Sequence, residues 1–109
     1  MTKDKEKQYH ADLKIYVKKG LYHVEGTEYC PADKESQVGV SLSSPHLTGS
    51  NCVDSIQDVL SRLKAEHTRI VLVNSMPLGA DRALHHEEIL DLKKYGITVK
   101  KPTLEHHLH

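Results

Sequence analysis

The sequence predicts a small α/β domain: a three-layer, Rossmann-like arrangement in which helices flank a short parallel sheet. Two apolar runs rich in β-branched residues, 38–42 and 69–73, have the composition of buried parallel strands. Each is followed by a polar loop and then by apolar residues at helical spacing. A third short apolar run at 97–99 completes a strand–helix–strand–helix–strand order, which implies right-handed crossovers between parallel strands.

The N-terminal third is expected to lie outside this core. Residues 1–10 carry mixed charge and little to bury, so a disordered start is predicted. Residues 11–24 alternate between apolar and polar side chains, with a plausible turn at 18–20, and predict a β-hairpin that adds an antiparallel edge. Residues 25–36 contain glycine, proline and charged residues and predict a loop. The Rossmann-like core is then expected over residues 37–102.

Two helices are predicted in the core. The first follows Ser50 or Asn51, either of which can cap a helix, and is expected to end near His67. The second spans residues 80–95 and has a weaker apolar stripe. Gly96 comes after it, where a left-handed residue commonly ends a helix.

Composition narrows the classes of function. Of 109 residues, 15 are Lys or Arg and 15 are Asp or Glu, so the formal net charge is zero. A neutral chain has no global attraction for a phosphate backbone, which argues against a dedicated duplex-binding protein. The sequence has no run of about 18 apolar residues and no signal-peptide core, so a cytoplasmic protein without a membrane partner is expected. Cys30 and Cys52 are predicted to be reduced thiols.

A ligand site is expected beyond the carboxyl ends of the parallel strands. Loops 41–51 and 74–81 lie there in the predicted fold, and both lead into helix N-termini, where unpaired amides favour an anion. Both loops are rich in small and hydroxyl-bearing residues, which suit a phosphate but are equally typical of turns and helix caps. The ligand-binding candidates are Ser41, Ser43, Ser44, Gly49, Asn74, Ser75, Gly79, Asp81 and Arg82.

Three residues are candidates for catalysis. Ser41 can act as a nucleophile if His46 or His85 lies within hydrogen-bond distance, and is otherwise a turn residue. Asp81 can bond a ribose hydroxyl or polarise a water, or it can simply stabilise the first turn of its helix. Glu88 is a second residue that can polarise water. It shares a helix face with His85, but no third ligand is assured, so neither a metal nor a cofactor is predicted.

The stretch Val71–His85 resembles the second half of a SLOG-type Rossmann domain, a superfamily that includes DNA-processing protein A and the cytokinin-activating phosphoribohydrolases. The resemblance rests on a hydrophobic strand, a turn, Gly79-Ala80-Asp81 and His85, and it covers about residues 37–101. Asn74-Ser75 replaces the family's glycine pair, and the arginine that often follows the first strand is missing. The resemblance implies a nucleotide, a nucleotide-derived signal or single-stranded DNA as ligand, with N-glycosidic hydrolysis as the enzymatic alternative.

A second resemblance concerns residues 39–49. Gly39–Leu42, then Thr48-Gly49 and an amphipathic helix, is similar to the start of tRNA-dependent cyclodipeptide synthases. This resemblance implies that Ser41 carries an aminoacyl group. The catalytic residues of that family's second half have no counterpart in this chain.

The third class of function is a non-catalytic interaction module, in which the two loops only cap helices. A short sheet has two exposed edges, and edge pairing between copies would give a homodimer. Residues 104–109 resemble a vector-derived Leu-Glu-polyhistidine tail, so the segment 103–109 is set apart from the fold.

Overall fold

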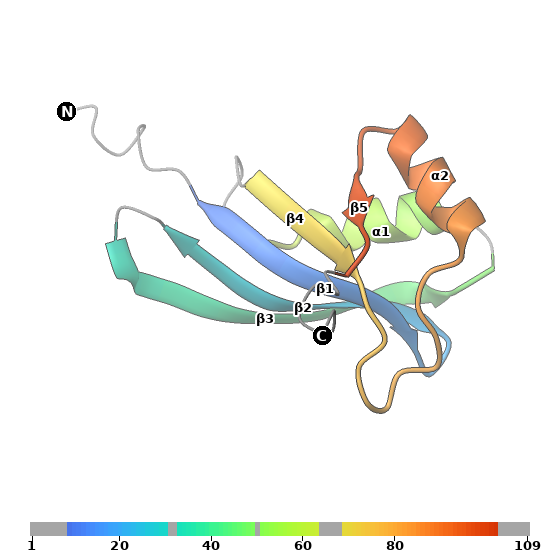
Figure 1. Cartoon of the computed structure of the whole chain (residues 1–109), viewed down its shortest axis with the longest axis horizontal. Helices are drawn as coiled ribbons and strands as arrows, with labels where there is room; N and C mark the ends of the chain where they lie inside the picture. Colours follow the sequence, from blue (N-terminus) through green and yellow to red (C-terminus); the bar gives the residue numbers. More distant parts are fainter. Residues whose placement is uncertain (1–8, 31–32, 50, 64–68, 103–109) are drawn as a thin grey trace, which may run out of the picture.

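A computed structural model describes residues 9–30, 33–49, 51–63 and 69–102 of the chain. The fold belongs to the predicted α/β class. Its described elements are, in chain order, β1 (His10–Lys18), β2 (Leu21–Cys30), β3 (Asp33–Leu47), α1 (Cys52–Leu60), β4 (Arg69–Asn74), α2 (His86–Lys94) and β5 (Val99–Lys100) (Figure 1). The predicted disordered start and the tail-like segment 103–109 lie almost wholly outside the described residues.

One mixed sheet, rather than a purely parallel one, organises the molecule. Its five strands have the order β3-β2-β1-β4-β5. β2 is antiparallel to both β1 and β3, whereas β4 is parallel to both β1 and β5. The prediction of a strand at 69–73 is confirmed by β4. The sheet therefore joins an antiparallel half to a parallel half, and β1 is the strand that they share.

β1 lies at the centre of the sheet and not at an added edge. It pairs with β2 across Lys19-Gly20, where both residues have positive φ angles of 54° and 77°. Its inward side chains, Ala11, Leu13, Ile15 and Val17, are at most 2% exposed. The separate core expected over 37–102 is therefore wrong, because residues 10–18 supply its central strand. Alternation shows which face of a strand is buried, but it does not show how many strands flank it.

The predicted loop 25–36 and the predicted parallel strand 38–42 belong largely to antiparallel strands. β2 continues to Cys30, and β3 begins at Asp33 and runs antiparallel along β2. Gly26, which favoured a loop, instead marks a close approach between β2 and β1. A Cβ atom at Gly26 would lie 2.0 Å from the Asp12 carbonyl oxygen, so a side chain has no room there.

Both helices contribute to one core on one face of the sheet. α1 contacts β3, β2 and α2, and α2 also contacts β5. Ile56 and Val59 of α1 and Leu92 of α2 join the inward side chains of β1 in a single buried cluster. The three-layer arrangement is not found in the described part of the chain, which has two layers. We call the opposite face of the sheet, over which no described helix lies, the open face (Figure 1).

The first helix is shorter than predicted. α1 begins after Asn51, which has a left-handed conformation and makes no side-chain cap hydrogen bond. The predicted end near His67 falls outside the described residues. No described helix is long and apolar enough to cross a membrane.

The second helix begins at His86 instead of Ala80. The residues before it bond to the end of β1: the Val17 amide donates to the Arg82 carbonyl at 2.9 Å, and the Asp81 amide donates to the Val17 carbonyl at 2.7 Å. These bonds keep the segment extended, which overrides its helical pattern. Gly96 has a φ of 85°, as predicted for the residue that follows the helix.

Candidate functional site

The loop predicted at 41–51 is wrong over 41–47, which belong to β3. The described remainder of it and the loop 74–81 reach the same edge of the sheet, because β3, β1 and β4 run in the same direction. The turn between β1 and β2 lies between them. The Thr48 amide donates to the Gly20 carbonyl at 2.8 Å, and the Gly20 amide donates to Asp81 Oδ2 at 3.0 Å. Asp81, a predicted catalytic residue, therefore caps this turn. We call the region formed by residues 19–20, 44–49, 51 and 74–85, together with Glu88, the carboxyl edge.

The two predicted glycines of this edge serve turns. Gly49 and Gly79 have φ angles of 114° and 93°, which side chains rarely permit. A glycine at either position is explained by the backbone conformation alone. Close approach of a phosphate is not needed to account for it.

The other polar candidates at the carboxyl edge bond to the protein itself. The Asn74 amide group donates to the Leu84 carbonyl at 3.2 Å, and Asn74 Oδ1 accepts from the Leu84 amide at 2.8 Å. The Ser75 hydroxyl donates to the Val73 carbonyl at 3.1 Å. Ser44 is buried, accepts from the Tyr22 amide at 3.0 Å and donates to the His46 carbonyl at 2.9 Å. These bonds fix the loops.

Arg82, one of the predicted ligand-binding residues, is paired with Glu88. Arg82 Nη1 lies 2.9 Å from Glu88 Oε1, and the Glu88 side chain is 15% exposed. Glu88 also accepts from the Tyr22 hydroxyl at 2.5 Å and from the His85 amide at 2.8 Å. Burial acts to raise the pKa of Glu88, but the bonds from Arg82, Tyr22 and the His85 amide outweigh it and lower that pKa. A carboxylate with this many donors is an anion held in place, which suits a structural role better than that of a general base.

Ser41 lies on β3 beside a histidine that the sequence analysis did not select. Ser41 Oγ is 3.3 Å from His23 Nε2, and His23 Nδ1 is 2.8 Å from Ser43 Oγ. Burial lowers the pKa of His23. A neutral imidazole can accept a proton from the Ser41 hydroxyl, so the geometry allows a nucleophile and a base. The pairing follows from the register of β2 and β3, which puts His23 opposite Ser43. No spacing along the chain reveals it.

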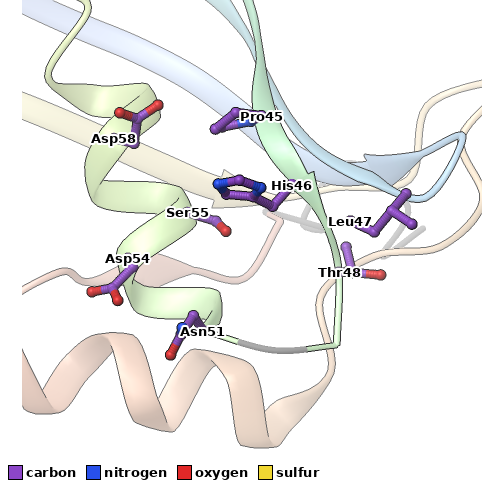
Figure 2. Close-up of a pocket in the computed structure, with 8 residues that line it drawn as sticks. All are labelled: Pro45, His46, Leu47, Thr48, Asn51, Asp54, Ser55 and Asp58. Atoms are coloured by element: carbon purple, nitrogen blue, oxygen red, sulfur yellow. The ribbon is translucent and has the colours of Figure 1, made fainter.

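His46, one of the two bases proposed for Ser41, lies in a cleft of about 810 Å³ between the end of β3 and α1. Figure 2 shows its ring in the space between the strand and the helix. Asp54 and Asp58 line the same cleft. Two carboxylates oppose the attraction that the N-terminus of α1 has for an anion, so this cleft is a poor phosphate site.

The open face carries cations that form no ion pair with another described residue. Strand register places His10 beside Tyr29 of β2 and Arg69 of β4, and it places Lys14 beside Glu25 of β2. The centroids of the His10 and Tyr29 rings are 5.6 Å apart, with 72° between the planes. The side chains of Lys14, Arg69 and Lys100 are exposed. None of them forms an ion pair within 4.0 Å in the described part of the chain.

The same face has a shallow hollow of about 480 Å³. Two carboxylates line it and each accepts a tyrosine hydroxyl: Asp12 Oδ2 from Tyr29 at 3.2 Å, and Glu25 Oε1 from Tyr16 at 2.7 Å. Burial and Glu25 together raise the pKa of Tyr16 to about 12, so this hydroxyl stays a donor. The remaining lining residues are Lys14, Gly26, Gly39, Val40 and Ser41.

The structure therefore separates the predicted site residues. Asn74, Ser75, Gly79, Asp81, Arg82 and Glu88 gather at the carboxyl edge, whereas Ser41 and Ser43 lie on the open face. Within the described residues, no group of three or more His, Cys, Asp or Glu side chains could hold a metal ion. Comparisons with protein-family models, curated proteins and solved structures found no match to this chain.

Proposed function

We propose that the open face binds nucleotide units, either free or within a single-stranded nucleic acid. The observation that supports this most directly is the row formed by Tyr29, His10 and Arg69 across three neighbouring strands. It puts two aromatic rings and a guanidinium together on a surface that no described helix covers. The proposal keeps the ligand class implied by the SLOG resemblance and moves its site from the carboxyl edge to the sheet.

The ring pair can hold a base by stacking. Tyr29 and His10 are both half-buried, so their rings are held in place while part of each remains accessible. Stacking of a base on an aromatic side chain contributes about 1–3 kcal/mol and works for every base, because each has a π-face. Arg69 lies beside His10 in the register and can contact a phosphate or extend the stack.

The cations are spread along the face. Lys14 is four residues beyond His10 on β1, and Lys100 lies beside Val73, the partner of Lys14. Four residues of strand span about 13 Å. A mononucleotide bound at the ring pair reaches Arg69 alone, whereas a strand of several nucleotides reaches all three cations. We therefore expect an oligonucleotide to bind more tightly than a mononucleotide.

The carboxylates of Asp12 and Glu25 limit where phosphates can lie, and they give the open face a preference for RNA over DNA. Lys14 lines the hollow together with both carboxylates, whereas Arg69 and Lys100 lie on β4 and β5, farther from Glu25. The carboxylates repel phosphates and direct them towards β4 and β5. Each carboxylate accepts one tyrosine hydroxyl and has further acceptor capacity. A ribose 2′-hydroxyl can donate to such an oxygen, so RNA is expected to bind better than DNA of the same length.

Fluorescence anisotropy with labelled oligouridylate and oligothymidylate of about ten nucleotides tests the proposal, with uridine monophosphate as competitor. The variant Lys14→Gln/Arg69→Gln should weaken oligonucleotide binding by about tenfold or more and reduce its salt dependence by one to two phosphate contacts, as lost lysine and arginine contacts do. Tyr29→Leu should weaken binding without changing the salt dependence.

The matched control is Lys93→Gln/Lys94→Gln, which removes the same charge from α2 in the other layer. This control should bind as the unmodified chain does. Equal weakening by both double variants would show that only net charge matters, and no binding by the unmodified chain would refute the proposal. If uridine monophosphate displaces the labelled oligonucleotide as effectively as an unlabelled oligonucleotide does, the open face is a site for free nucleotides.

A further inference from the structure

β3 forms an unusual edge of the sheet. The other edge, β5, is two residues long, whereas β3 is fifteen residues long and has no described strand on its outer side. Figure 1 shows β3 along the margin of the sheet. The outward amides and carbonyls of such a strand can pair with another chain, and proteins commonly protect them with charge, proline, bulges or short length.

The central part of β3 has little of this protection, apart from Arg62, whose guanidinium donates to the Ser43 carbonyl at 3.1 Å in a bond that a pairing strand would have to replace. Its pairing with β2 is irregular at both ends, between Leu21 and His23 and between Glu28 and Cys30, but it is regular from Val38 to Ser43. Residues 36–44 contain no charged residue and no proline. Val38 is 40% exposed, which is high for a large apolar side chain. The regular segment Val38–Ser43 is therefore a strand edge without charged residues of its own, between two irregular ends.

We propose that two copies of this chain pair antiparallel along Val38–Ser43 and join their five-stranded sheets into one. The occupant is a second copy because the segment matches itself. With a two-fold axis near Val40 or Ser41, the charged residues Asp33–Glu35 of one copy lie opposite 45–49 of the other, which contains no Asp, Glu, Lys or Arg. No like charges then face each other across the junction.

Pairing with a second copy would satisfy outward backbone groups of Val38–Ser43 and cover the hollow beside them. Six residues of regular antiparallel ladder supply about six backbone hydrogen bonds. A hollow of about 260 Å³ at this edge is lined by Val38, Val40 and Leu63, which follows α1, and also by the charged residues Glu28 and Arg62. Side chains of a second strand would cover this hollow. Because paired residues of antiparallel strands share a face, the two open faces would also become one continuous surface.

Light scattering coupled to size-exclusion chromatography, run from about 1 µM to 1 mM, tests the pairing over the range of weak dimers. The unmodified chain should move from its monomer mass of 12.3 kDa towards twice that value as concentration rises. Val38→Lys should remain monomeric at every concentration. The matched control Leu90→Lys changes an apolar side chain of similar exposure, 45%, on α2 and should dimerise as the unmodified chain does.

Two further measurements keep the result decisive. Circular dichroism must show that Val38→Lys is folded; if it is not, Ser41→Lys, at an exposed position of the same segment, takes its place. Amide hydrogen exchange should slow in residues 38–43 as concentration rises, with no change in α2. A monomer at every concentration, or equal dimerisation by Val38→Lys and the unmodified chain, would overturn the proposal whether or not the open face binds nucleotides.

Discussion

The carboxyl edge and the open face each carry an arginine, but only the arginine of the edge forms an ion pair within the described residues. Arg82 makes an ion pair with Glu88 and also donates to the Ala83 carbonyl. Arg69 is exposed and has no such pair. Residue type alone does not distinguish these two arginines. A polar group becomes a binding candidate when its hydrogen-bonding capacity remains after the fold is built.

Disruption of the Glu88 cluster should have the largest effect on stability. Glu88→Gln removes the charge that pairs with Arg82 and leaves the guanidinium and the Tyr22 hydroxyl poorly bonded. We expect a loss of about 3 kcal/mol in the free energy of unfolding, measured with urea, because breaking a largely buried pair leaves an uncompensated charge. The control Glu87→Gln, one residue away and exposed, should change it by less than about 0.5 kcal/mol. Equal losses would contradict a special role for Glu88.

The same cluster predicts how stability depends on pH. The folded-state pKa of Glu88 is lowered from its ordinary value of 4.5, so its contribution is present above that value and is lost as the pH falls through the folded pKa. The difference in unfolding free energy between the unmodified chain and Glu88→Gln should therefore shrink between neutral pH and about pH 3. A difference that stays constant over this range would show that the ionised carboxylate is not what stabilises the edge.

Asp81→Ala should have an intermediate effect. The lost hydrogen bond from the Gly20 amide holds the β1–β2 turn against the segment before α2. The free energy of unfolding should fall by about 1 kcal/mol, which lowers the melting temperature by roughly 4–8 °C in a domain of this size. Asp91→Ala, at an exposed position of α2, is the control and should lower the melting temperature less. Oligonucleotide binding should survive in Asp81→Ala; its loss would return Asp81 to the binding site.

The open-face variant should have the smallest effect on stability. Lys14→Gln/Arg69→Gln removes two exposed charges that have no ion-pair partner in the described part of the chain, so the free energy of unfolding should change by less than about 0.5 kcal/mol. The same protein should show the large loss in binding described above. Substantial destabilisation would mean that these cations support the fold, as Arg82 does.

Local patterns predicted the α/β class, the strand at 69–73 and the apolar stripe of the first helix, because these depend on residues close together in the chain. The stripe predicted for the second helix lies mostly before α2, whose buried residue is Leu92. Local patterns did not predict the central place of β1, because the alternation of apolar and polar residues does not show how many strands pair with a strand. Gly26 suggested a loop, yet its reason is the backbone of β1 across the ladder. Likewise, the contact of Ser41 with His23 depends on the pairing of β2 with β3.

The candidate site was harder to predict for a related reason. Asn74, Asp81 and Arg82 are residue types that suit a phosphate, and they suit a turn equally well. Whether such a group is free depends on partners up to 61 residues away, as for Asp81 and Gly20. The sequence therefore predicted where polar groups concentrate, but not which of them are already bonded.

The most direct test is to map binding by NMR. Amide chemical shifts of the ¹⁵N-labelled chain would be followed during titration with an oligouridylate of about ten nucleotides. If nucleotides bind the open face, the largest shifts should occur at His10, Lys14 and Arg69, with little change at Gly49 and Asp81. Shifts concentrated at residues 48–51 and 79–82, with the open face unchanged, would contradict it and restore the carboxyl edge as the binding site.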